Sequence, residues 1–173
     1  MPKVIINYIL LFFALVIGQA ILFNNLVLFN SAVALVFLYL IVELPMTIRI
    51  NWLLTIAFFM GLSVDVFQDT PGLNALSCTV IAFMRRFIFH LYVPRDEEYT
   101  GHRICINSVG MSTFLKYMLT MVLIYCIMYF CLEALTYSDI HRLVERIIAS
   151  SAFTFVVIFA LDSLTVKRSE KRL

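Results

Sequence analysis

The stretch Gly61–Leu76, GLSVDVFQDTPGLNAL, places two carboxylates four residues apart just before a Pro-Gly turn, in a chain that is otherwise strongly apolar. If the residues before the turn are helical, Asp65 and Asp69 share one helix face, with Asp65 about 6 Å further from the turn. The Thr70-Pro71-Gly72 segment then separates this helix from the next one. The stretch therefore predicts two consecutive helices with an acid buried near their junction.

The composition on either side of this stretch indicates an integral membrane protein. The chain has 173 residues, of which 62% are hydrophobic and 14% are charged, and its mean hydropathy is +0.97. Soluble domains do not have this composition. We expect an all-α fold forming a single six-helix membrane domain over residues 1–173, because apolar runs of about 20 residues recur along the chain. The predicted spans are about 4–24, 28–47, 52–69, 71–93, 112–135 and 145–165.

Basic residues predict the orientation of these spans. With six spans the two termini share a side, and that side collects eight basic residues against two on the other. The eight are Lys3, Arg49, Arg95, Arg103, Lys167, Arg168, Lys171 and Arg172, and the two are Arg142 and Arg146. Because flanking Lys and Arg resist translocation, both termini are predicted to be cytoplasmic. A loop at about 94–111 and a basic tail at 166–173, which would attract membrane lipid, then face the cytoplasm.

The two acids of the opening stretch, Asp65 and Asp69, differ in how strongly the sequence favours a functional role for them. Both can simply mark a solvated helix end, but an ionisable group inside the membrane by default faces a bundle interior or a cavity. Asp65, the deeper acid, is the stronger functional candidate. Asp69 is expected to lie near the positive end of the following helix, which Thr70 is expected to cap, with Pro71 in its first turn.

Among the other charges within the predicted spans, two arginines and two acids are candidates for an ion pair. Arg85 and Arg86 interrupt the fourth span, and a cation facing lipid is costly unless it reaches the headgroups or finds an acid. Glu43 and Asp162 lie at comparable depth. We predict an intramembrane ion pair between one of the arginines and one of these acids.

The sequence favours neither catalysis nor metal binding. It has no nucleophile, base and orienting group at a recognisable spacing, and no phosphate-binding glycine loop. His102 and Cys105 lack the further ligands that a tetrahedral zinc site needs. The four cysteines are expected to be free thiols. We therefore expect no enzyme activity, no cofactor and no nucleic-acid partner.

The opening stretch also resembles a known family. Gly61, Leu62 and Asp65 match a Gly-Leu-x-x-Asp element at the end of a third span, and residues 72–76 match the Gly-Leu-x-Ala-Leu element that opens a fourth. In length, topology and these residues the chain resembles the rod shape-determining protein MreD family. Members of that family often have a glycine where this chain has Gln68 or Asp69, so Asp69 is not assumed to share a family role.

The resemblance implies a non-enzymatic scaffold of the bacterial cell-elongation complex, which supports lateral peptidoglycan synthesis and cell shape. The implied location is the inner membrane, and the implied partners are MreC, the MreB filament, the glycosyltransferase RodA and the elongation transpeptidase. The implied fold is similar to that of the substrate-binding subunits of vitamin transporters. The candidate partner or cavity-lining residues are Gly61, Ser63, Asp65, Asp69, Gly72 and Asn74.

A second interpretation stays open, namely a small-molecule (vitamin-like) binding or transport subunit. In that case Asp65, Asn74 and Arg85 would line a cavity open to the outside. Retention of a vitamin through purification would favour this interpretation, whereas co-purification with MreC would favour the scaffold.

Overall fold

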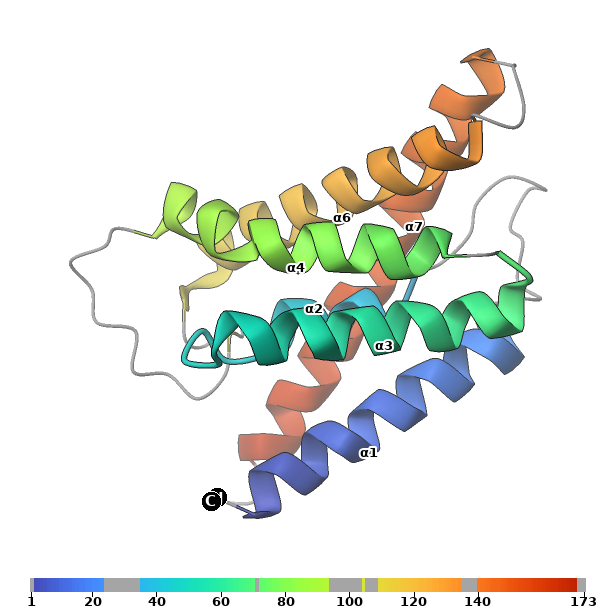
Figure 1. Ribbon diagram of the computed structural model, residues 1–173. Helices are drawn as coiled ribbons and strands as arrows, with labels where there is room; N and C mark the ends of the chain where they lie inside the picture. Colours follow the sequence, from blue (N-terminus) through green and yellow to red (C-terminus); the bar gives the residue numbers. More distant parts are fainter. Residues whose placement is uncertain are drawn as a thin grey trace.

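The computed structural model describes residues 2–23, 35–70, 72–93, 104, 109–134 and 140–170. All regular secondary structure in that part of the chain is helical, as the sequence predicted. The elements, shown in Figure 1, are α1 (Pro2–Gly18), a π-helix η1 (Gln19–Phe23), α2 (Leu38–Glu43), α3 (Ile50–Gln68), α4 (Leu73–Tyr92), α6 (Met111–Ala134) and α7 (Ile140–Glu170).

Four helices are long and apolar enough to cross a membrane. They are α3, α4, α6 and the Leu143–Ser163 part of α7. Their bounds agree with the third to sixth predicted spans to within two residues at each end. Gly72 and Gly110, which directly precede α4 and α6, have positive φ angles of 80° and 87°, a conformation that glycine adopts without strain. These glycines set where the two helices begin.

The first predicted span corresponds to α1 followed by η1, with an apolar run over Ile6–Ile21. The chain changes from α- to π-helical at Gln19, whose side chain is buried. Its Oε1 accepts a hydrogen bond of 3.0 Å from the backbone N–H of Val36. A π-helical turn often occurs at a site with a specific role, and here it carries a side chain that binds the start of another helical segment.

The second predicted span, about 28–47, differs most from the structure. Only α2, six residues long, is helical between residues 35 and 49. Pro45 restricts the residue before it to an extended conformation, and Leu44 has φ −50° and ψ 142°, so the helix ends there. Residues 36 and 37 form a turn that precedes α2. A continuous helix over the described part of this span is therefore wrong; residues 24–34 lie outside the described residues.

The short helix α2 lies inside the bundle. Every residue from 35 to 45 is buried, and the backbone N–H of Leu35 donates to Oγ1 of Thr154 on α7 at 3.0 Å. Together with the Gln19 bond, this satisfies two buried amides that precede a helix and have no partner within it. Irregular backbone is tolerated inside a membrane only where protein surrounds it in this way, so the burial of α2 is compatible with a membrane bundle.

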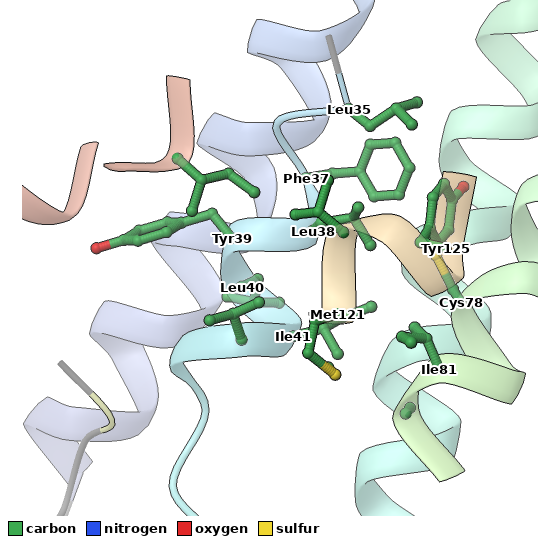
Figure 2. Close-up of a cluster of buried hydrophobic side chains, with 14 of the residues drawn as sticks. Leu35, Phe37, Leu38, Tyr39, Leu40, Ile41, Cys78, Ile81, Met121 and Tyr125 are labelled. Carbon is green, nitrogen blue, oxygen red and sulfur yellow. The ribbon is translucent and has the colours of Figure 1, made fainter. Parts of the chain in front are cut away.

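The long helices pack in chain order. Helices α3 and α4 lie side by side and make the most extensive helix contact, α6 lies against α4, and α7 packs mainly on α6 and crosses the other helices at a steep angle (Figure 1). Figure 2 shows Leu35 and Phe37 pointing toward Tyr125 of α6, while Tyr39 points the opposite way. The rings of Phe37 and Tyr125 meet edge to face at 5.7 Å between centroids. The core therefore surrounds α2.

Candidate functional site

The site is built on the hairpin of α3 and α4, and Gly61 permits its close packing. A Cβ atom at Gly61 would lie 2.5 Å from Cα of Ala75 and 2.5 Å from the carbonyl oxygen of Asn74. Real side chains do not approach backbone atoms this closely, so the first turn of α4 lies against α3 only because residue 61 has no side chain. One helical turn further along α3, this close approach brings Asp65 to the start of α4.

The carboxylate of Asp65 accepts four hydrogen bonds from the beginning of α4 and the turn before it. Oδ1 accepts from Oγ1 of Thr70 at 2.8 Å, from the backbone N–H of Asn74 at 2.9 Å and from Nδ2 of Asn74 at 3.0 Å. Oδ2 accepts from the backbone N–H of Ala75 at 2.9 Å. The side chain is only 5% exposed. The buried acid therefore has partners on both of its oxygens.

This arrangement caps α4 from a neighbouring helix. The residue at the N-cap position is Gly72, which has no side chain to bond the free amides, and Asp65 supplies the missing acceptor. A negative charge at this position also interacts favourably with the helix dipole. The expectation that Thr70 caps α4 is wrong, because the hydroxyl of Thr70 donates to Asp65 instead. Pro71 lies outside the described residues.

Asn74 extends the network to a third helix. Its Nδ2 also lies 2.9 Å from Oε1 of Gln68 and 3.2 Å from Oγ1 of Thr70. Its Oδ1 accepts a hydrogen bond of 2.6 Å from the hydroxyl of Tyr125 on α6. Asn74 and Tyr125 are both fully buried. One polar network thus joins α3, α4 and α6 inside an apolar core.

The other candidates from the opening stretch lie outside this network. Asp69 is exposed and adopts a left-handed conformation with φ 51° at the end of α3, where its backbone N–H bonds the carbonyl of Asp65. Ser63 donates its hydroxyl to the carbonyl of Phe59 within α3 at 2.8 Å. The candidates that the structure brings together are therefore Gly61, Asp65, Gly72 and Asn74.

The four charges of the predicted ion pair occupy three helices: Glu43 lies on α2, Arg85 and Arg86 lie on α4, and Asp162 lies on α7. Arg85 is 1% exposed, and its Nε lies 3.2 Å from the hydroxyl of Tyr117 on α6. Arg86 is exposed and donates to the carbonyl oxygens of Met46 and Ile48 at 3.4 and 2.7 Å. The described partners of both arginines are thus a phenol and backbone carbonyls.

Glu43 on α2 and Asp162 on α7 are each 1% exposed. The ion pair predicted between one of these acids and an arginine stays a prediction. Separately, α6 and α7 share an ion pair in which Nη1 of Arg146 lies 3.0 Å from Oε1 of Glu133. The guanidinium of Arg146 also lies 4.8 Å from the ring centre of Phe130.

Sequence reasoning missed three residues that hold this interior together: Tyr125, Gln19 and Thr154. Each is a polar side chain in an apolar run, which is the signal that could have identified it, because buried polar groups require partners. Their partners are up to 119 residues away in the chain, and local spacing does not predict such a separation. Residues 94–103, 105–108 and 171–173, with His102 and Cys105 among them, lie outside the described residues.

The network has little capacity for chemistry. Asp65 receives four donors, so its lone pairs are directed into the bundle and are not available to take a proton from a substrate. Within the described residues, no three His, Cys, Asp or Glu side chains are grouped so as to hold a metal ion. No protein-family model, curated protein or solved structure matches the chain.

Proposed function

We propose that the protein is a non-enzymatic membrane scaffold of the bacterial cell-elongation complex. The observation that supports the proposal is that the Asp65 carboxylate on α3 binds the first backbone amides of α4. This acid is the most distinctive polar group of the chain, and its hydrogen bonds join two helices of one bundle. A buried carboxylate in this role gives α3 and α4 one fixed arrangement, which a scaffold needs in order to present a constant surface.

The lateral surface of the hairpin suits partners within the membrane. Helices α3 and α4 expose large apolar side chains along their outer faces. Those with the largest exposed fractions are Trp52, Phe59, Val66, Phe67, Phe83, Phe87 and Leu91. Apolar area alone gives little drive for association in lipid, where close packing and a few polar groups decide specificity. A rigid hairpin supports such packing because its side chains stay in register.

The proposed setting follows from the resemblance to the MreD family and from the charge bias. It is the inner membrane, with both termini in the cytoplasm. The proposed partners are MreC, the MreB filament, the glycosyltransferase RodA and the elongation transpeptidase. Under this proposal, lateral wall synthesis requires the bundle to hold its partners together and requires no turnover by the bundle itself.

The alternative of a vitamin-like binding subunit has less support. It needs Asp65 and Asn74 to offer free polar atoms to a ligand. Instead, the two side chains bond each other at 3.0 Å and Asn74 also binds Tyr125. A ligand at this position would first have to break bonds that hold the helices together.

Depletion in the host bacterium tests the proposal, with two readouts, cell shape and vitamin uptake. We expect rod shape to be lost and uptake to be unchanged. We also expect a photo-crosslinking residue at the exposed position Val66 to capture MreC or another elongation protein, whereas the same residue at the buried position Val64 does not. Normal cell shape together with lost uptake would refute the scaffold and support the transport alternative.

A further inference from the structure

Arg85 is the largest fully buried side chain of the described core, and its described hydrogen-bond partner is a phenol and not a carboxylate. Its described hydrogen bond is the one from Nε to the hydroxyl of Tyr117. Nη2 is buried and has no hydrogen-bond partner among the described residues. A guanidinium stays protonated in proteins, so Arg85 cannot lower the cost of burial by losing its charge. A buried charge of this kind requires an anion.

Tyr117 gives the guanidinium a second donor beside it. The phenol is 1% exposed and receives the Arg85 hydrogen bond on its oxygen, so its own hydrogen remains available to an acceptor. The two groups come from different helices, α4 and α6, and meet at 3.2 Å. Two convergent donors, one of them charged, are the chemistry that recognises an oxyanion.

Exposed cations lie at the same end of the bundle. We call Arg49 and Arg86 the basic belt; both are exposed, and Lys116 on α6 is an exposed cation outside the belt. Arg49 directly precedes α3, and Arg86 binds the Met46 and Ile48 carbonyls beside it. Lys116 lies next to Tyr117 on α6. Arg85 is seven residues, or about 10 Å of helix rise, from Tyr92 at the end of α4, so it lies behind this belt.

We propose that Arg85 and Tyr117 form the inner part of a phosphate-binding site, to which the basic belt attracts its ligand. The source is the headgroup of an anionic phospholipid or free phosphate. A phosphate oxygen would accept from Nη2 of Arg85 and from the Tyr117 hydroxyl, and the long arginine arm can extend along α4 toward the belt. Anionic lipid collects at a basic membrane surface, which keeps the ligand available.

The test uses the full-length protein in a non-ionic detergent, with phosphatidylglycerol, phosphatidylcholine and inorganic phosphate as separate probes. Thermal unfolding and native mass spectrometry report binding. We expect phosphatidylglycerol to bind at one saturable site and to raise the midpoint of unfolding, and phosphatidylcholine to do neither. A rise with inorganic phosphate alone would support the site and identify free phosphate as its source.

Variants distinguish a specific phosphate site at Arg85 and Tyr117 from a general attraction of anionic lipid to exposed cations. We expect Arg85→Met to weaken phosphatidylglycerol binding at least tenfold and Tyr117→Phe to weaken it severalfold. Arg85→Lys keeps the positive charge but lacks the planar set of N–H donors of a guanidinium, so its affinity for phosphatidylglycerol should lie between those of the wild type and Arg85→Met. The matched control is Lys116→Met, which removes an exposed cation at the same end and should change binding less than twofold. If Arg85→Met does not fold, Tyr117→Phe and Arg85→Lys still decide the question.

Two results would overturn the proposal. One is an equal loss of binding in Lys116→Met and in the Arg85 variants, because the attraction would then be diffuse. The other is a wild type that responds to neither phosphatidylglycerol nor phosphate, together with Glu43→Gln or Asp162→Asn destabilising it as much as Arg85→Met. An internal carboxylate would then neutralise the arginine, as the predicted ion pair requires.

Discussion

Replacing Asp65 with asparagine tests the cap on α4 most directly. Asparagine keeps one carbonyl oxygen, which can still accept from Thr70 and Asn74, but its NH₂ group then faces the backbone N–H of Ala75, to which Oδ2 is now bonded. The lost bond is charge-assisted and contributes about 1.5–3 kcal/mol. Loss of the negative charge from the helix N-terminus adds about 0.5–1 kcal/mol. The expected loss is therefore on the order of 2–4 kcal/mol.

This magnitude exceeds what an ordinary interhelical contact in a membrane provides. Single hydrogen bonds between transmembrane helices contribute about 0.6 kcal/mol on average. Asp65 differs because it is charged, is nearly fully buried and serves two backbone amides that have no other partner in their own helix. At about 1.4 kcal/mol per tenfold change, the expected loss corresponds to roughly a 30- to 700-fold change in the unfolding equilibrium.

The measurement is an SDS titration of the purified protein in mixed micelles, followed by circular dichroism. The matched control is Asp69→Asn, four residues away in the same helix hairpin. Asp69 is exposed, and asparagine tolerates its left-handed conformation, so the control should stay within about 0.5 kcal/mol of wild type. Equal stability of the two variants, or a loss below about 1 kcal/mol for Asp65→Asn, would refute the capping role.

Three further substitutions test neighbouring features in the same titration. Gly61→Ala should lower the stability by about 1–3 kcal/mol or prevent assembly, because its Cβ would meet backbone atoms at 2.5 Å. In the control Gly18→Ala, the added Cβ would have no atom within 4 Å, so no stability should be lost. Equal effects of the two substitutions would contradict the close packing of α4 on α3 at Gly61. Tyr125→Phe should cost about 1–3 kcal/mol, because it leaves Oδ1 of Asn74 without its buried donor; an unchanged midpoint would show that the link to α6 is dispensable. Asp69→Gly should stabilise by about 1 kcal/mol, because glycine adopts a positive φ without strain; a loss of stability would mean that the carboxylate itself contributes.

Regular features of the sequence predicted the long helices well. Each of α3, α4 and α6 comes from one predominantly apolar run that ends at polar or turn residues. Length and hydropathy are local properties, and in a bilayer they decide whether a segment forms a spanning helix. The second span was predicted less well because residues 35–45 are just as apolar as a spanning helix. Their burial inside the bundle, with Gln19 and Thr154 bonding the first amides, depends on contacts across the whole chain.

In the stretch Gly61–Leu76, too, local sequence properties predicted one part of the structure and tertiary contacts decided the other. The sequence by itself determined that Asp65 lies one turn deeper than Asp69 and that a group at this depth requires partners, because the helix period and the cost of burial are local physics. Only the tertiary structure decided what those partners are. Gly61 lets α4 approach α3, and this approach turns two unbonded backbone amides toward the carboxylate. Backbone donors are common to every residue type, so no sequence pattern marks them, and only the packing of the helices selects the two amides that Asp65 binds.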